Sequence, residues 1–475
     1  MLSDNRGTGT TLSDNSRSEL VEKPADENDL TLEHTIAASP AIGETSTETE
    51  DGGNGAWLTV AGAWMIQFCT FGYLNAFGVY QDYYTLTLLP NASPSDISWI
   101  GSVQLFLMYA LAVFVGNAFD AGYFHHVQIV GSLLLVLSVF CLSFVPTTPS
   151  PSLYAKVFLA QGLGTGLAVG LLFLPSLSIV SHRFPRTRPR RAALAMGITV
   201  SGASAGGIVW PILLNRMFQE GGLGFKNGVR VCGGIVAGLL VLANCLMRTK
   251  GAAKKRRPVF TRVGFLRIAR DGAYMWSIAG AFCTNLGLFV PFFYLQLFAS
   301  EHGVSPIVTT YILAILNAGS TLGRILPVAL ASHVGVYTML LPAIATSAGL
   351  VFALAGVRGA PGVGTVAALF GLSSGTYVSL IPPLLGTLCT DLGELGLRMG
   401  LAFSLVGTSM LVGTPVFGAL LDASGGDVKE RIWWRAVVFA GVSPSSFPLV
   451  PLFLARARKH PLAPRWHSDR GESAS

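Results

Sequence analysis

One arginine lies inside an otherwise apolar stretch of the chain. Arg324 falls in the run 306–330, two helical turns after Asn317. An ionisable side chain in such a run needs a polar cavity or a partner, because a lone charge among apolar groups costs several kcal/mol. The guanidinium donates in a planar fork that matches a carboxylate, so we expect Arg324 to bind an organic anion. In the alternative interpretation, it reaches the polar interface or braces a neighbouring helix.

Neutral polar side chains within the apolar runs could join Arg324 in one cavity. Five of them are amides, namely Asn75, Gln161, Asn285, Gln296 and Asn317. Each amide needs a hydrogen-bond partner from another helix, from water or from a ligand. Tyr294 and Tyr377 could add a hydroxyl group and an aromatic wall. For each of these side chains the alternative is a structural contact between helices.

Small residues and one acid point to moving helices. Gly162, Gly166 and Gly170 recur at every fourth position, a spacing that lets two helix backbones approach closely. Such contacts can slide or rock, so we assign these glycines an indirect, conformational role. Asp120 follows an apolar run, and we expect it to brace one conformation by capping a helix or pairing with a loop arginine. The alternative for Asp120 is a solvated acid without a role.

Patterns for other chemistries are missing from the sequence. The eight histidines fall in tails or loops, and the adjacent pair His125 and His126 lacks the i, i+4 spacing of a helical metal site. A Walker-type phosphate loop is absent, and the apolar runs hold no Ser/His/Asp or paired-carboxylate arrangement. We therefore expect neither a metal nor a cofactor, and no enzymatic activity.

The composition indicates a lipid environment. Apolar residues make up 51% of the 475 residues and charged residues only 12%, against roughly 25% charged residues in soluble proteins. The formal net charge of +7 comes from short basic clusters between apolar runs. This distribution is typical of membrane topology and argues against a nucleic-acid partner.

Twelve apolar runs are long enough to cross a bilayer, which needs roughly 20 helical residues. They lie at 57–79, 98–118, 127–146, 153–180, 192–216, 229–247, 272–298, 306–330, 336–357, 362–387, 397–420 and 432–455. The expected fold is an all-α membrane protein with twelve transmembrane helices in two six-helix bundles.

Basic residues predict the orientation. They collect between runs four and five, between runs six and seven and after run twelve, which places both termini in the cytoplasm. The opposite side carries the sequon Asn91-Ala92-Ser93, a candidate glycosylation site. The expected parts are a disordered acidic cytoplasmic tail (1–54), an N-terminal bundle (55–247), a basic cytoplasmic linker (248–271), a C-terminal bundle (272–456) and a basic cytoplasmic tail (457–475). We expect the plasma membrane.

Several motifs resemble one transporter family. The run from Asp51 to Trp57 looks like the acidic-Gly-Gly-…-Trp signature of the monocarboxylate porter family, in the fungal branch, within the major facilitator superfamily. Further similar stretches lie at 95–102, 116–122, 190–197, 291–294, 317–324 and 413–415. The spans that carry Asn75 and Asn317 are similar to the family's substrate-lining helices. The resemblance implies two halves that rock around a site at the membrane midplane.

Two positions depart from the family pattern. Asn75 and Ser320 stand where monocarboxylate carriers have a lysine and an acid. We therefore expect a secondary active transporter for a small organic anion or a carboxylated, secondary metabolite, with efflux as one direction. Protons, if coupled, would travel on the substrate's own carboxyl group, because no carboxylate is evident within the spans. The alternatives are a proton-linked monocarboxylate uptake carrier and a nutrient sensor that does not transport.

Overall fold

The computed structural model describes residues 53–146, 148, 150–184, 189–219, 221–247, 268–388, 395–422 and 432–445. All regular elements in these ranges are helices. The expected basic tail and most of the basic linker lie outside the described residues. The expected acidic tail also lies outside them, apart from its last two residues.

The first half of the chain forms six spans, three of them built from more than one element. Their bounds are α2 (Asn54–Cys69), α3 (Phe71–Leu74), α4 (Phe77–Tyr83) and the π-helix η1 (Tyr84–Leu88); α5 (Pro94–Ala110) and α6 (Ala112–Asp120); α7 (Phe124–Ser143); α8 (Leu153–Val157), the π-helix η2 (Phe158–Thr165) and α9 (Gly166–Arg183); α10 (Pro189–Phe218); and α11 (Gly224–Leu246).

The second half forms the other six spans. Their bounds are α13 (Gly272–Leu288) with α14 (Val290–Glu301), α15 (Pro306–Val334), α16 (Val336–Ala353), α17 (Ala360–Thr387), α18 (Leu395–Leu421) and α19 (Trp433–Ser445). Within the described residues, nine helical segments are long and apolar enough to cross a membrane. The remaining three lie where runs one, two and twelve predict them, so the all-helical, twelve-span prediction is confirmed.

The boundary of the first span differs from the prediction. The predicted span ends at residue 79, but the helix continues through α4 and η1 to Leu88. The polar residues Gln81 and Asp82 therefore lie on a helix, and the predicted loop shrinks to a turn of residues 89–93. The next helix begins with a capping box, in which Ser93 and Asp96 satisfy each other's backbone amides.

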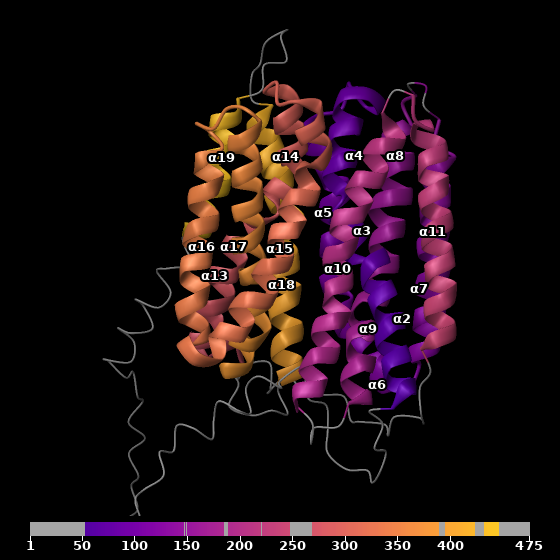
Figure 1. Ribbon diagram of the computed structural model, residues 1–475, viewed down its shortest axis with the longest axis vertical. Coiled ribbons are helices and arrows are strands. Elements are labelled where there is room, and N and C mark those ends of the chain that lie inside the picture. Colours follow the sequence, from indigo (N-terminus) through magenta and orange to yellow (C-terminus); the bar gives the residue numbers. More distant parts are fainter. Residues whose placement is uncertain are drawn as a thin grey trace, which may run out of the picture.

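The helices gather into two bundles that stand side by side, the first half in indigo to magenta and the second in orange to yellow (Figure 1). The most extensive contacts between them join α4 with α14, α5 with α18, and α10 with α15. A site between the halves would be built mainly on these six helices.

Within the second bundle, α15 and α17 make the most extensive contact. Glycines on both helices allow it, since a Cβ at Gly323 would overlap the carbonyl oxygen of Leu372, and one at Gly371 would overlap that of Leu316. Because only glycine fits at these positions, this face of α15 lies directly against α17. The contact fixes how α15 is rotated, and α15 carries Arg324.

Candidate functional site

Among the described residues, Arg324 on α15 has no partner of opposite charge. Its guanidinium carbon is 5.3 Å from the centre of the Phe71 ring, on α3 of the other half. Within the described part of the chain, this guanidinium makes no hydrogen bond or ion pair, and its Nε atom is buried and unbonded. Cation–π contact alone does not replace the five hydrogen bonds that a guanidinium can donate. The arginine is therefore available to an anion.

Asn75 and Asn317 lie on two helix faces that meet at the interface between the halves. Phe71, Asn75 and Gly78 are spaced along one face of the first span, and Leu313, Asn317 and Arg324 along one face of α15. The two faces run antiparallel. At one end, Gly78 is so close to α15 that an added Cβ would lie 2.8 Å from the Leu313 side chain. At the other end, Phe71 meets Arg324.

Along these faces, both predicted amides fall between the two contacts. Asn75 is 3% exposed and its Nδ2 has no partner among the described residues. Asn317 is fully buried, and its Nδ2 donates to the Leu313 carbonyl (2.8 Å) while its Oδ1 accepts nothing from the same part of the chain. An unsatisfied buried polar atom costs about 1–3 kcal/mol. A donor and an acceptor without partners among the described residues lie on the faces that also carry Phe71 and Arg324, and a polar ligand could satisfy them.

Aromatic rings from both halves lie on the Phe71 side of Arg324. Phe71 packs against Phe173 with ring centres 5.8 Å apart, and Tyr109 packs against Phe173 (6.3 Å) and Phe403 (5.4 Å). Tyr109 is also near enough to Arg324 for the two side chains to interact electrostatically. A cation and a few amides among rings can hold a planar organic anion, with the rings excluding water and the polar groups fixing its orientation.

Tyr294 was expected with these residues, but the structure places it elsewhere. Its hydroxyl bonds to the carbonyls of Pro94 (2.9 Å) and Thr414 (3.3 Å), where α5 begins and α18 approaches its end. Tyr294 thus contributes to a contact between the halves, whereas Arg324 lies about five turns along α15 from its first residue, Pro306. Tyr377 is occupied inside the second bundle, where Asn285 donates to its hydroxyl (2.7 Å).

The halves are hydrogen-bonded to each other at one end, which we call the closed end. Ser95 of α5 donates to the Pro415 carbonyl of α18 (2.8 Å), and Ser102 bonds to Thr414. Arg216 of α10 donates to the Tyr311 hydroxyl of α15 (2.7 Å). These bonds join the two bundles on the side where α14 ends and α15 begins.

A second set of closed-end bonds centres on Gln296 of α14. Its Nε2 donates to Asp82 of α4 (3.1 Å) and to Asn215 of α10 (2.8 Å), both in the other half. The sequence analysis named Gln296 but missed both partners. Asp82 was assigned to a loop, and the prediction that the spans hold no carboxylate is wrong for this residue. Assigning residues 80–88 to a helix would have placed Asp82 within the first span.

Comparisons with known proteins agree with this architecture. The model of the Major Facilitator Superfamily matches residues 56–393, which is more than half of the chain. The chain belongs to the major facilitator superfamily. A crystal structure of a single-residue mutant of the nucleoside transporter NupG shows the same fold, with a TM-score of 0.63 over 84% of this chain and 99% of that one, at 14% identity.

Fungal members of the superfamily are much closer in sequence. The chain is 35% identical over 393 residues to the aspyridones efflux protein apdF of Emericella nidulans, covering 82% of this chain and 77% of that protein. It is 34% identical over 416 residues to the MFS-type transporter dbaD of the same species, covering 87% and 88%. These relatives are transporters, and this protein is a multi-pass membrane transporter of the same superfamily.

The predicted glycine stripe packs the fourth span of this transporter against the second. A Cβ on Gly162 would lie 3.5 Å from the Ile100 carbonyl oxygen, an ordinary contact. On Gly166 it would lie 2.9 Å from Leu107 Cδ1, and on Gly170 it would lie 2.7 Å from the Leu107 carbonyl oxygen. The approach therefore tightens toward Gly170. Asp120 is the last residue of α6, and its side chain lies outside the described part.

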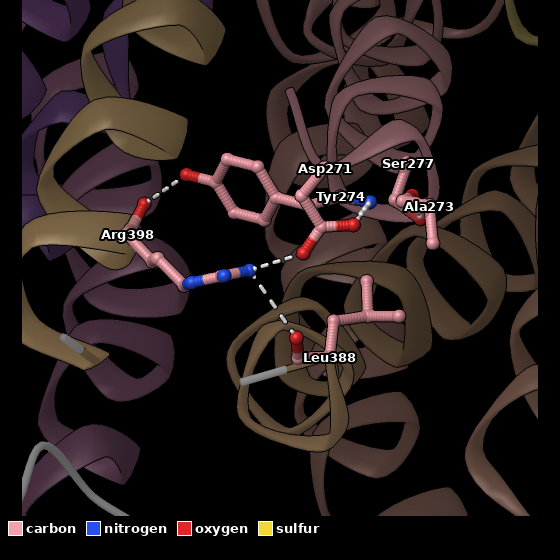
Figure 2. Close-up of polar contacts among 6 residues, drawn as sticks. All are labelled: Asp271, Ala273, Tyr274, Ser277, Leu388 and Arg398. Carbon is pink, nitrogen blue, oxygen red and sulfur yellow. Dashed lines mark hydrogen bonds and ion pairs between the residues drawn. The ribbon is translucent and has the colours of Figure 1, made fainter. Parts of the chain in front are cut away.

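One charged cluster of the transporter was missed by sequence reasoning. Figure 2 shows Arg398, at the start of α18, donating to the Asp271 carboxylate (2.7 Å) and to the Leu388 carbonyl (3.3 Å). Asp271 also caps α13 by accepting from the Tyr274 amide (3.2 Å), and the Tyr274 hydroxyl donates back to the Arg398 carbonyl. The cluster ties together three helices of the second half. Arg398 is 4% exposed, so this is a buried ion pair.

Proposed function

We propose that this transporter exports an acidic, ring-bearing small molecule and that Arg324 is its anion contact. The observation that carries the proposal is the Arg324 guanidinium, which lies over Phe71 and has no hydrogen-bonding partner within the described ranges. Asn75 Nδ2 adds a second donor for an acidic oxygen, and Asn317 Oδ1 adds an acceptor for a hydroxyl or N–H group of the cargo. The aromatic wall favours a planar ring.

The relatives support export as the direction. One of them is named for the efflux of aspyridones, and others are named only as MFS-type transporters. The resemblance to the monocarboxylate porter branch gives a second candidate, uptake of a small monocarboxylate with a proton. The neutral Asn75 and Ser320, at the positions of that branch's lysine and acid, favour the first candidate over the second.

Transport would proceed by alternating access of the two bundles. The closed end would face outward, because the Asn91 turn lies at that end and the basic clusters of the sequence fall at the other. Both termini would then be cytoplasmic, and the cargo would enter from the cytoplasm. The plasma membrane is the location that export from the cell would require.

The test compares intracellular and extracellular metabolites in cells that carry the native protein, no protein, Arg324→Ala or Arg324→Lys. We expect one acidic compound to accumulate inside cells without the protein and inside Arg324→Ala cells. A charge-assisted contact contributes about 1.5–3 kcal/mol, so Arg324→Ala should weaken cargo binding roughly 10- to 100-fold. Arg324→Lys keeps the charge without the planar fork and should fall between.

Arg230→Ala is a matched control. Arg230 also lies over an aromatic ring, with its guanidinium carbon 5.4 Å from the centre of Phe144, but it is exposed. Export should be unaffected by its removal. If the metabolite profile is unchanged in cells without the protein, the nutrient-sensor alternative is favoured. If those cells instead contain less of an acid, the protein takes that acid up. Full export by Arg324→Ala would show that Arg324 does not bind the cargo.

A further inference from the structure

Asn285 has a buried hydrogen-bond acceptor that no described residue uses. Its Nδ2 donates to the Ala281 carbonyl (2.8 Å) and to the Tyr377 hydroxyl (2.7 Å), and these two bonds fix the orientation of the amide. The other polar atom, Oδ1, is buried and accepts no hydrogen bond within the described ranges. A buried acceptor without a donor is unfavourable, so a ligand that supplies a donor gains affinity at this position.

The bond between Asn285 and Tyr377 joins two helices whose backbones make little contact. α13 carries Asn285 and packs mainly on α18 and α19, whereas α17 carries Tyr377 and packs mainly on α15 and α16. The two side chains therefore meet between helices that are not direct neighbours. Each residue is only 2% exposed, so the bond lies away from bulk water. A further hydrogen bond made there is stronger than one made in bulk water.

Glycine contacts place Tyr377 close to the level of Arg324. The contact between α15 and α17 continues one turn beyond Gly371, where a Cβ on Gly375 would overlap the Ser320 carbonyl oxygen. The two helices therefore run parallel. Tyr377 comes two residues after Gly375, and Arg324 comes four residues after Ser320, so their levels differ by two residues, about 3 Å along the axis.

Tyr109 joins this level from the other half. A Cβ on Gly407 of α18 would lie 3.2 Å from Tyr109 Cβ, so α5 approaches α18 closely at this residue. Tyr109 is near enough to Arg324 and to Tyr377 for electrostatic interaction with both side chains. A cargo ring that packs on Tyr109 would therefore have both the guanidinium and the Asn285–Tyr377 pair nearby.

We propose that Asn285 Oδ1 is a second recognition point for the cargo and accepts a hydrogen bond from a hydroxyl or N–H group. The cargo is then an acid whose ring also carries a hydrogen-bond donor. Its acidic group binds Arg324, its ring lies beside Tyr109, and its donor reaches Asn285. A site with a buried acceptor disfavours analogues that lack the donor. The inference rests on the proposed function, because it narrows the class of cargo for the Arg324 site.

Asn244 on α11 provides a matched control. Its Nδ2 donates to the Leu240 carbonyl (2.7 Å), four residues earlier, and to the Ser132 hydroxyl (3.0 Å), and its Oδ1 also lacks a partner among the described residues. These three residues lie on α11 and α7, inside the first bundle. An amide oxygen without a partner therefore does not by itself indicate a cargo site. What distinguishes Asn285 is its bond to Tyr377, near the level of Arg324.

The experiment measures dissociation constants of aromatic acids for the full chain in lipid nanodiscs, by saturation-transfer NMR. The probes are benzoate and 2-naphthoate, their ring-hydroxyl derivatives, and the corresponding methoxy derivatives, which cannot donate a hydrogen bond. We expect the best hydroxyl derivative to bind roughly 2- to 10-fold more tightly than its methoxy counterpart. This preference should vanish in Asn285→Ala and persist in Asn244→Ala, while the unsubstituted acid binds similarly to all three proteins.

Tyr377→Phe carries the test if Asn285→Ala does not fold. It removes the hydroxyl that orients the amide, so the preference for the hydroxyl derivative should fall while the unsubstituted acid still binds. An unchanged preference in this variant would then overturn the inference. The same conclusion follows if the native protein shows no preference, if the preference survives in Asn285→Ala, or if it is lost in Asn244→Ala.

Failure of the Arg324 site would give a different result. Arg324→Ala would then bind the unsubstituted acids as tightly as the native protein, or none of the acids would bind to the native protein. Either result would refute the proposed function, and the inference with it. If binding depends on Arg324 but shows no preference for the hydroxyl group, the proposed function stands and only the role of Asn285 is refuted.

Discussion

Replacing Asp271 by asparagine should reveal what the buried ion pair with Arg398 contributes to stability. Asparagine is as good a helix cap as aspartate, so Asp271→Asn keeps the bond from the Tyr274 amide and removes only the charge. Removing one partner of a buried pair costs about 3–5 kcal/mol. Because Asp271 is 29% exposed and water reaches it, we expect the lower figure, about 3 kcal/mol.

Asp271→Ala should cost about 1 kcal/mol more, since it also removes the cap. Arg398→Met removes the charge from the other side and keeps most of the apolar length. In the double variant Asp271→Asn/Arg398→Met no lone charge remains, so its loss of stability should be smaller than the sum of the two single losses by about 2 kcal/mol.

The assay is SDS-induced unfolding from mixed micelles, followed by tryptophan fluorescence. It should rank the native protein first, then Asp271→Asn, then Asp271→Ala. Additive single losses in the double variant would refute the reasoning, because the two side chains would then not interact. Equal stability of the alanine and asparagine variants would show instead that Asp271 does not cap α13.

Two further predictions use features of the first half. Gly170→Ala should destabilise the contact between the fourth span and the second and slow transport, because its Cβ would lie 2.7 Å from the Leu107 carbonyl oxygen. Gly162→Ala should behave as the native protein, and transport and thermal-unfolding assays on both variants test this difference. A glycan at the exposed Asn91 should lower the electrophoretic mobility of the protein, and both glycosidase treatment and Asn91→Gln should abolish this shift. A native band without the shift would show that Asn91 is not glycosylated.

The spans could be predicted because length and apolarity alone select a membrane helix. The same criterion explains the error at the first span. Asp82 lowers the apolarity of residues 80–88, yet the helix continues because Asp82 and Gln81 bond to groups outside it, on α14 and at the start of α5. Partners supplied by distant residues leave no local signal in the sequence.

The candidate site likewise contains some residues that could be predicted from the sequence and others that could not. Arg324, Asn75 and Asn317 could be singled out because a polar residue in an apolar run is conspicuous, and the register between the first span and α15 brings them together. Tyr294 could not be placed, since its role depends on whether its end of the bundle is open or closed. Arg398 escaped notice because it stands at the edge of a predicted span, where an arginine usually reaches the lipid headgroups.

The interlocking glycines of α15 and α17 bear on how this protein could acquire a new cargo. Gly323 and Gly371 leave no room for α15 to rotate, so Arg324 and Asn317 are presented in one fixed orientation. Evolution toward another substrate would then change the residues that face this helix rather than the helix itself. Phe71 and Asn75, on the opposite half, are the positions where such divergence should concentrate.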